Sequence, residues 1–232
     1  MKSIAYPYTY SNVNGVWIMR DGVGDKPRRT PRKNEVVATG LSAAEVLERI
    51  SGERLGRHFI SHMHDLDTDP SAIRAHYKAN GYRVLLSEEF FVHDSDEIPE
   101  LTCYPQVARV STIDQSDLIR KQRRNKKAVR DIDLESETPE HRLYAVLDDK
   151  QAYGWVGSVP FGESSWIADL CVLPRFRGRG YGSALMCEAT RDDRRHGVRD
   201  SVLLASSAGA RLYPHIGYTH IGTLQLFCPK RS

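Results

Sequence analysis

The sequence predicts a mixed α+β protein in which helices flank a central mixed sheet. In the second half of the chain, short apolar runs that are typical of strands alternate with longer runs that are typical of helices. A glycine-rich turn at residues 174–182 follows the strand-like run 166–173 and leads into a helix-like run. Such a turn between a strand and a helix is typical of folds that bind an anion.

The first hundred residues begin with less regular patterns. Residues 21–34 are predicted to form an exposed loop, because glycine, proline and basic residues dominate them. Residues 41–50 are predicted to start a helix, with Ser42 as the N-cap and Glu45 at the third helical position, which is the capping-box pattern. Residues 57–62 are predicted to form a strand.

The segment 73–82, a predicted helix closed by a Gly-Tyr pair, resembles the segment 210–218. The matching residues are Tyr77 with Tyr213 and Gly81-Tyr82 with Gly217-Tyr218. A predicted pair of strands, 83–87 and 89–93, completes the first of these units. The pattern indicates an internal repeat.

Two interpretations of the first half remain open. It is either a shortened, degenerate copy of the fold of the second half, without a glycine turn and therefore without its ligand, or an unrelated α+β cap. The acidic run 94–100 is the predicted linker. The predicted domains are therefore residues 1–100 and residues 101–232.

The second half is predicted to follow the order β-α-β-β-β-α-β-α-β. Asp148-Asp149-Lys150 is expected to form a polar hairpin turn, and Gly197 is expected to end a helix in the left-handed conformation. The predicted elements are a strand at 107–111, a charged helix at 115–130, strands at 142–147, 154–159 and 166–173, a helix at 181–196, a strand at 201–205, a helix at 208–215 and a closing pair of strands within 218–227.

Length and composition favour a compact soluble protein. A chain of 232 residues is long enough for one large or two small domains, and 33 basic against 30 acidic residues give a net charge of only +3, which argues against a dedicated nucleic-acid binder. Residues 1–10 lack a signal-peptide pattern, and no apolar run approaches the ~20 residues that cross a bilayer. A cytoplasmic location is expected. The four cysteines form no C-x-x-C pair, so neither a zinc site nor a disulfide framework is predicted.

The glycine turn has the chemistry of a phosphate or pyrophosphate cradle. Gly178, Gly180 and Gly182 have no Cβ, so the backbone can approach a ligand closely and direct N–H groups at it. A P-loop would need Gly-Lys-Ser or Gly-Lys-Thr, which is absent here. A dinucleotide fold is closer, because Asp200 follows the turn at about the expected ~20 residues, but too little chain follows Asp200 for its parallel sheet.

The turn resembles the central signature of the GCN5-related N-acetyltransferase (GNAT) family, Arg/Gln-x-x-Gly-x-Gly/Ala between the fourth strand and the third helix. Residues 177–182, Arg-Gly-Arg-Gly-Tyr-Gly, fit this signature, and residues 175–180 fit it as well. Residues 169–174 resemble the strand and proline that lead into it, and residues 210–218 resemble the next helix of the family, with its tyrosine and closing Gly-aromatic pair. The resemblance extends from near Tyr104 to the end of the chain and implies the acyl-CoA N-acyltransferase (GNAT) fold.

The resemblance implies that acetyl-coenzyme A is the acetyl donor and that no metal is needed. Its pyrophosphate would lie on the turn, and its amide-bearing pantetheine arm would pair like a strand with the preceding strand. A backbone N–H near Cys171 or Val172 would stabilise the oxyanion. Ser206 stands where the family usually has an asparagine that contacts the pantetheine arm or a water. The predicted cofactor-binding residues are Leu170, Cys171, Val172, Arg177, Gly178, Arg179, Gly180, Tyr181, Gly182 and Ser206.

The resemblance also implies catalytic roles. The acceptor would be a primary amine, which must lose a proton before it attacks. Tyr213 matches the family tyrosine that protonates the leaving thiolate, and Asp169 is the predicted base, directly or through a water; a carboxylate that only orients a loop is the alternative for Asp169. The family often has a glutamate where this chain has Trp166, so direct base catalysis stays open. Further candidate contributors are Glu163, His215, Asp65 and Asp67.

The predicted function is acetyl transfer to a small-molecule amine, because an additional N-terminal half could wall off the acceptor site. The alternatives are acetylation of a protein amine and a non-catalytic regulatory module that binds acyl-coenzyme A. The basic run 120–127 is predicted to be a solvated helix face rather than an RNA-binding patch, and no metal site is predicted at His62 and His64. The expected partner is a small-molecule amine, without nucleic acid or membrane, and the sequence is compatible with a homodimer.

Overall fold

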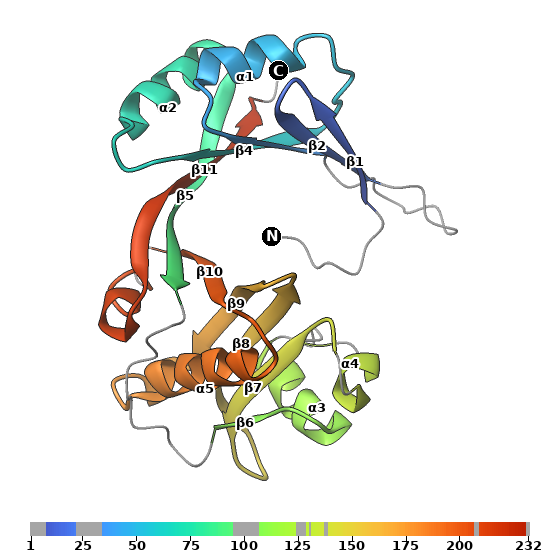
Figure 1. Ribbon diagram of the computed structural model, residues 1–232, viewed down its shortest axis with the longest axis vertical. Helices are drawn as coiled ribbons and strands as arrows, with labels where there is room; N and C mark the ends of the chain where they lie inside the picture. Colours follow the sequence, from blue (N-terminus) through green and yellow to red (C-terminus); the bar gives the residue numbers. More distant parts are fainter. Residues whose placement is uncertain are drawn as a thin grey trace. The chain divides into compact units, whose positions relative to one another are not determined.

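Figure 1 shows a computed structural model of the chain, which describes residues 8–21, 34–94, 107–123, 129, 131–136, 139–206 and 209–230. Residues 22–33 of the predicted loop and residues 95–100 of the predicted linker lie outside the described residues. Among the described helices, none is long and apolar enough to cross a bilayer.

The chain forms two compact units that do not follow a single cut in the sequence. Unit 1 comprises Met1–Glu89 and Ile221–Ser232, and unit 2 comprises Phe90–His220. Strand β5 (Tyr82–Asp94) continues from unit 1 into unit 2, and strand β11 (Thr219–Pro229) continues from unit 2 into unit 1. The predicted domains at residue 100 differ from these units chiefly in the last strand, which completes the sheet of unit 1.

The sheet of unit 1 is an antiparallel meander followed by a parallel crossover. Strands β1, β2 and β3 pair antiparallel, β3 pairs parallel with β4, and β11 pairs antiparallel with β4. The elements are β1 (Tyr8–Val13), β2 (Val16–Asp21), β3 (Asn34–Thr39), α1 (Ala43–Ile50), β4 (His58–His64) and α2 (Pro70–Ala79).

Helices α1 and α2 lie on the same face of this sheet (Figure 1). Burial alternates along the strands as expected for a sheet covered on one side: Val16 and Ile18 are fully buried, whereas Trp17 between them is 52% exposed. Val46 of α1, Tyr77 of α2 and Phe227 of β11 complete the core. The last strand of the chain therefore contributes directly to the core of unit 1.

Helix α1 begins with the predicted capping box. The Ser42 hydroxyl accepts a hydrogen bond from the Glu45 backbone N–H at 3.3 Å, and the Ser42 backbone N–H donates to the Glu45 carboxylate at 2.8 Å. The first orphan amides of the helix are satisfied locally, and a carboxylate stands against its positive end.

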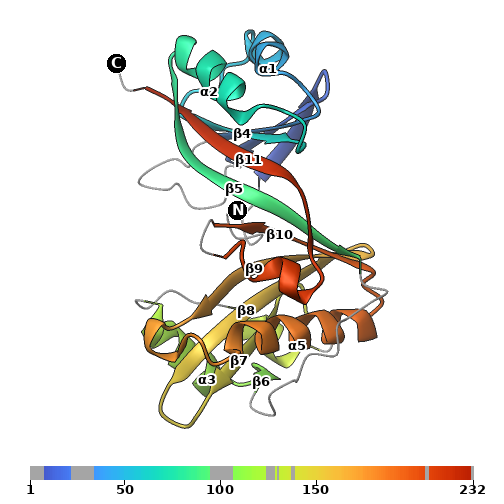
Figure 2. The ribbon, with the colours of Figure 1, turned by 90° about the vertical axis from the view of Figure 1, so that its left-hand side faces the viewer.

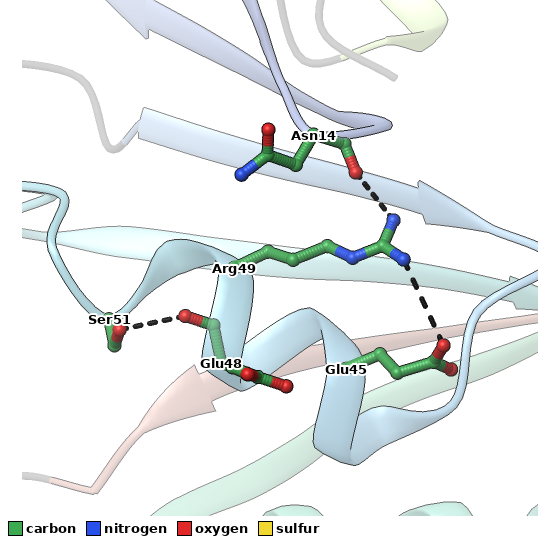
Figure 3. A pocket seen from close by; sticks show the side chains of 5 residues that line it. All are labelled: Asn14, Glu45, Glu48, Arg49 and Ser51. Carbon is green, nitrogen blue, oxygen red and sulfur yellow. Dashed lines mark hydrogen bonds and ion pairs between the residues drawn. The ribbon is translucent and has the colours of Figure 1, made fainter.

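The other end of α1 is clamped to the β1–β2 hairpin, as Figure 3 shows. Arg49 donates to the backbone carbonyl of Asn14 and lies 3.8 Å from the Glu45 carboxylate. Gly15, at φ +88°, permits this approach, because a Cβ there would lie 3.0 Å from Arg49 Nη1. The contact between Arg49 and Asn14 crosses the hollow in Figure 3 and holds the hairpin on α1. The residues that line this hollow are Asn14, Glu45, Glu48, Arg49 and Ser51.

Unit 2 is a helix–sheet–helix sandwich. Its strands follow the order β10-β9-β8-β7-β6, with β5 next to β10. The elements are β6 (Val107–Arg109), α3 (Ile113–Gln122), α4 (Asp131–Glu135), β7 (Arg142–Leu147), β8 (Ala152–Phe161), β9 (Ser164–Val172), the 3₁₀ turn η1 (Pro174–Phe176), α5 (Tyr181–Arg195), β10 (Asp200–Ala205) and the 3₁₀ turn η2 (Tyr213–Ile216).

Alternate residues of the unit 2 strands enter two separate cores. Tyr144 and Val146 of β7 pack with Leu185 of α5, whereas Leu143 and Ala145 pack in the core that contains Ile119 of α3. Figure 2 shows α5 crossing one face of β7, β8 and β9. The mixed sheet flanked by helices is the predicted fold class.

A buried ion pair fixes α5 on the sheet. Arg142 of β7 donates to Asp193 of α5 at 2.8 Å, and the Ser158 hydroxyl of β8 donates to the other carboxylate oxygen at 2.6 Å. Burial raises the pKa of Asp193, against the opposing effects of its hydrogen bonds and of Arg142. Because the pair is desolvated, removal of either partner would leave an uncompensated buried charge.

Four predicted elements are corrected by the structure. The segments 83–93 and 218–227, predicted as strand pairs, are single long strands, because each runs on from one unit into the other instead of folding back. The helix predicted at 115–130 spans Ile113–Gln122, with Arg123 as its C-cap, and residues 124–128 lie outside the described residues.

The helix predicted at 208–215 is the fourth correction. Among the described residues it is a turn at 209–212 followed by η2. The Gly209 and Ala210 backbone N–H groups both donate to the Ser206 carbonyl, and Pro214 has no N–H with which to continue an α-helix.

Substitution of Gly15 by alanine should destabilise the protein by about 1–2 kcal/mol, because alanine is strained in the left-handed region and its Cβ would displace Arg49. Gly40→Ala has the same backbone strain but no atom within 4 Å of its Cβ, so it should retain the clamp. Gly52→Ala has neither effect and should be close to neutral. Urea unfolding of the three variants measures both contributions, and equal stabilities for Gly15→Ala and Gly40→Ala would contradict the clamp.

His62 should make unit 1 sensitive to acid. Its ring is fully buried and shares a 2.9 Å hydrogen bond with the Tyr77 hydroxyl; burial lowers the pKa of His62 to about 4, against an opposing hydrogen bond with the Leu41 backbone. Between pH 6.5 and pH 4 the unfolded chain therefore takes up a proton that the folded chain excludes, which removes about 3 kcal/mol of stability as the pH falls.

This loss is measured by comparing unfolding free energies at pH 7 and pH 4.5 for the wild type and His62→Gln. The variant should lose less stability over this range, whatever its stability at pH 7. His76→Gln, at a partly exposed position of the same helix as Tyr77, serves as the control and should follow the wild type. An unchanged pH dependence in His62→Gln would refute the prediction.

Candidate functional site

The parallel strands β9 and β10 are hydrogen-bonded only at their beginnings. Ser164, Ser165 and Trp166 pair with Asp200, Ser201 and Val202, and the described residues contain no further pair between the two strands. Both strands continue, β9 to Val172 and β10 to Ala205. Beyond Trp166, the edge of β9 that faces away from β8 therefore lacks a strand partner.

A β-bulge at Asp169 accompanies this separation. Gly157 of β8 pairs with Ala168, and Trp155 pairs with Cys171, so one residue of β8 opposes two residues of β9. Asp169 adopts the left-handed conformation, at φ +56°, which is uncommon for a residue other than glycine. Such strain is concentrated at functional sites.

The bulge reverses which side chains face α5. Ile167 packs against the core on the α5 side, and Leu170 and Val172 do so after the bulge, whereas Cys171 packs on the α3 side. Without the additional residue, Cys171 would lie on the same face as Ile167. The three predicted donor-binding positions therefore lie on two faces of one strand, and burial raises the pKa of the Cys171 thiol.

An arginine side chain contacts the edge of β9 that has no strand partner. Arg177 Nε donates to the Val172 carbonyl at 3.0 Å, while the Leu173 N–H pairs with Tyr153 on the β8 side. Because antiparallel ladders alternate, the backbone N–H of Val172 shares the side of its carbonyl. Of the two predicted oxyanion donors, Val172 is the one whose backbone faces away from β8.

The glycine turn leads from this edge into α5. Gly178 has φ +72° and Gly180 has φ +75°, and Gly180 is the N-cap residue of α5, which has no side-chain cap and no acidic residue in its first turn. The first N–H groups of a 15-residue helix are thus directed at the turn without a protein acceptor from the cap. This is the arrangement that binds phosphate groups.

The corresponding helix start in unit 1 is closed to an anion. Helix α1 also follows a strand that pairs parallel with the next one, but Ser42 and Glu45 satisfy its first amides with an oxygen and a carboxylate. The ladder between β3 and β4 also continues over six residue pairs, from Asn34–His58 to Thr39–Met63. Only unit 2 therefore combines an uncapped helix start with an unpaired strand edge among the described elements.

Arginines and aromatic rings surround the turn. The Arg175 and Arg179 guanidinium carbons lie 4.8 Å and 5.6 Å from the centre of the Phe176 ring. Phe176 in turn packs on Tyr153 at 4.5 Å, and Tyr153 stacks with Tyr181 at 6.1 Å. Positive charge is thus held near the turn on an aromatic support.

Gly182 brings Tyr213 to the same region. A Cβ on Gly182 would lie 3.3 Å from the Leu212 side chain and 3.9 Å from that of Val172, so the first turn of α5 packs closely on both. Tyr213, the next residue after Leu212, is 6% exposed, and burial raises its pKa to about 12. Its hydroxyl therefore stays protonated at neutral pH and can act as a proton donor.

Ser206 and Gly209 lie at the same end of β10 as Tyr213. A Cβ on Gly209 would be 3.5 Å from Tyr213 Cε2 and 3.6 Å from Ser206 Oγ. The Ser206 carbonyl is used by the turn that follows, whereas its hydroxyl is an exposed group beside the tyrosine ring. The predicted donor-binding serine and the predicted acid are therefore neighbours.

Asp169 forms an ion pair with Arg123, an arginine that was not among the predicted site residues. Arg123, at the end of α3, donates to Asp169 Oδ2 at 2.6 Å, and its side chain is only 19% exposed, against 58% for Asp169. The sequence prediction treated this arginine as part of a solvated helix face. Nothing in the basic run 120–127 distinguishes Arg123, because its partner lies 46 residues away.

The further candidates lie outside this cluster or carry no special contact. Glu163 is an exposed partner of Arg199 at 3.4 Å, and His215 is exposed on η2. Trp166 stacks on Phe90 at 6.5 Å. Asp65 and Asp67 belong to unit 1. The described residues contain no group of three or more His, Cys, Asp or Glu arranged to hold a metal ion.

Comparison with known proteins agrees with this geometry. A family model described as "Acetyltransferase (GNAT) domain" matches residues 139–220, which contain the bulge, the turn and Tyr213. A search of curated proteins found no match.

Solved structures extend the likeness to both units. A GCN5-related N-acetyltransferase from Kribbella flavida aligns with a TM-score of 0.64 at 13% identity, over 97% of this chain and 90% of that chain. A functionally unknown protein from Staphylococcus epidermidis aligns with a TM-score of 0.64 at 14% identity, over 100% and 96%. A tandem GNAT protein from the clavulanic acid biosynthesis pathway aligns with a TM-score of 0.53 at 13% identity, over 82% and 69%.

At these identities the structural likeness establishes the fold, and the family model identifies the domain. The resemblance that was predicted from the glycine turn is confirmed over residues 139–220, which match the model of the GNAT acetyltransferase domain.

Proposed function

We propose that unit 2 transfers the acetyl group of acetyl-coenzyme A to a primary amine of a small molecule. The observation that carries this proposal is the uncapped, glycine-lined start of α5, immediately after a strand whose outer edge has no partner. A ligand with a pyrophosphate at one end and an extended chain of amides at the other matches both features at once.

The turn would hold the pyrophosphate. Backbone N–H groups of residues 178–182 and the positive end of α5 favour a doubly charged anion, and Arg175 and Arg179, which lie over the Phe176 ring, add positive charge. The Arg177 N–H of the predicted set donates instead to the Pro174 carbonyl. The pantetheine amides would pair with the free edge of β9 as an additional strand. Arg177 would then release the Val172 carbonyl, which it occupies in this structure, and move toward the phosphates.

The reaction forms one C–N bond and breaks one C–S bond. Asp169, directly or through a water, would take a proton from the ammonium group before the neutral amine attacks, and the second proton of the nitrogen would pass to solvent as the tetrahedral intermediate collapses. Asp169 Oδ1, the oxygen that Arg123 does not contact, has no hydrogen-bond partner among the described residues. The Val172 N–H would stabilise the oxyanion on the carbonyl. Tyr213 would donate its proton to the departing thiolate of coenzyme A and regain one from solvent.

The comparisons support the family chemistry, while the donor and acceptor rest on the site. The tandem GNAT structure is described as lacking acetyl-coenzyme A, which points to this compound as the donor in a protein of the same fold. The most direct test is to supply acetyl-coenzyme A with panels of small amines, amino sugars and peptides and to measure the release of free thiol. Tight binding of the donor without release from any amine class would reject the enzyme and favour a non-catalytic module.

Substitution of Tyr213 by phenylalanine should lower kcat by about 100-fold or more while the Kd for acetyl-coenzyme A stays within a few-fold of the wild type, because only the proton donor is lost. Steady-state kinetics and calorimetric binding measure the two quantities. Tyr218→Phe is the matched control, since its hydroxyl is bonded to Ser201 at 2.6 Å and its loss should affect stability rather than kcat. Equal kcat values for Tyr213→Phe and the wild type would exclude Tyr213 as the acid.

Substitution of Gly178 by alanine should weaken coenzyme A binding by about tenfold, because a left-handed alanine distorts the cradle. Gly197→Ala is the control: it lies at the other end of α5, with φ +80°, and neither position has an atom within 4 Å of the added Cβ. Both variants should lose similar stability, but only the first should lose affinity. Pantetheine without phosphates should bind both variants alike, and a Gly178→Ala variant with unchanged affinity for coenzyme A would show that the phosphates lie elsewhere.

A further inference from the structure

Units 1 and 2 each contain a pair of tyrosines in the same edge-to-face arrangement. Tyr77 and Tyr82 of unit 1 contact edge to face, with ring centres 5.7 Å apart at 70°. Tyr213 and Tyr218 of unit 2 contact in the same way, at 5.6 Å and 62°. In each unit the first tyrosine also packs on a phenylalanine of the strand that arrives from the other unit.

These phenylalanines are Phe227, 4.2 Å from Tyr77, and Phe91, 5.5 Å from Tyr213. Each stands at the same spacing after the second tyrosine of its own segment, Phe91 after Tyr82 and Phe227 after Tyr218. The two units therefore share a structural frame in which equivalent residues can be compared.

The second tyrosine fixes the register of the comparison. The Tyr82 hydroxyl bonds to His58 at 3.0 Å, and the Tyr218 hydroxyl bonds to Ser201 at 2.6 Å. Each partner is the first buried residue of its strand, β4 or β10. Counting along the buried face, Ile60 then corresponds to Leu203, and His62 corresponds to Ala205.

The last correspondence marks the difference between the units. In unit 1, His62 Nδ1 holds the Tyr77 hydroxyl at 2.9 Å, and β3 and β4 stay paired beyond this level. In unit 2, Ala205 presents only a methyl group, the β9–β10 ladder has already ended at Val202, and no described residue bonds to the Tyr213 hydroxyl.

We infer that Ala205 is a positioning residue of the acetyl-transfer site: its small side chain leaves the Tyr213 hydroxyl uncaptured and available to the thioester end of the donor. In unit 1 the corresponding position is His62, and its ring forms a hydrogen bond with the hydroxyl of Tyr77, the counterpart of Tyr213. This inference rests on the proposed function of Tyr213 and adds the residue that permits it.

Gly209 supports the same assignment. The space that its Cβ would fill lies 3.5 Å from Tyr213 Cε2, beside the hydroxyl end of the ring, and 3.6 Å from Ser206 Oγ. Gly209 thus leaves room beside the Tyr213 ring, in the same core cluster that contains Ala205. Ser206 is the polar group nearest to that space.

The test introduces the unit 1 residue into unit 2. Ala205→His should capture the Tyr213 hydroxyl and lower kcat about 100-fold, to the level of Tyr213→Phe, with the Kd for coenzyme A changed less than about threefold. In the double variant, Ala205→His with Tyr213→Phe, kcat should be no lower than in either single variant, because both act on one hydroxyl. A purely structural effect of the histidine would add to the loss from Tyr213→Phe instead, and this additivity would overturn the inference.

Ala205→Asn provides a smaller side chain that still carries a hydrogen-bonding group near the position of the histidine Nδ1. If Ala205→His does not fold, the asparagine variant decides: a substantial loss of kcat that Tyr213→Phe does not deepen supports the inference, and a wild-type kcat overturns it. His62→Ala, which alters only unit 1, is the control and should leave kcat unchanged. Failure of the proposed function is recognised separately, because the wild type would then release no coenzyme A with any amine.

Discussion

The early end of the β9–β10 ladder is the constraint on which the site depends. Backbone N–H and C=O groups of a strand need partners, and beyond Trp166 the outer edge of β9 has no strand to supply them. The Arg177 side chain donates to the Val172 carbonyl in this structure. A donor that carries amide groups can replace it, so the protein keeps a strand position that an extended ligand can fill. The bulge at Asp169 belongs to the same feature, because it bends β9 where the two strands separate.

The glycine turn acts only in combination with that edge. A helix start becomes an anion site when its amides lack a cap, and α1 and α5 show the two outcomes within one chain. In α1, Glu45 sets a carboxylate against the helix dipole. In α5, left-handed Gly180 ends the turn without a side-chain acceptor, and arginines surround it. Local sequence therefore determines which of two similar strand–helix connections has a side-chain cap and a carboxylate and which has neither.

The features that the sequence predicted are those that local chemistry determines. The capping box of α1, the left-handed Gly197, the strand limits of β7 and the turn before α5 each follow from a few neighbouring residues. The features that it missed depend on distant partners. Neither the pairing of Arg123 with Asp169 nor the long course of β5 and β11 between the units is written in a local pattern. The bulge was missed for a related reason: an additional residue in β9 is recognised only from its pairing with β8, which the sequence does not specify.

Strands β5 and β11 each belong partly to both units. Each unit completes its core with a phenylalanine from the strand of the other segment, so neither core can be assembled from its own segment alone. Unit 1 differs from the proposed donor site in three features: its β3–β4 ladder is continuous, Glu45 places a carboxylate at the start of α1, and His62 bonds to the Tyr77 hydroxyl. Because Phe227 of β11 follows the residues of unit 2 in the sequence, the core of unit 1 is completed only after the whole of unit 2 has been synthesised, and a truncation before Phe227 would open unit 1 while leaving every residue of the proposed donor site present.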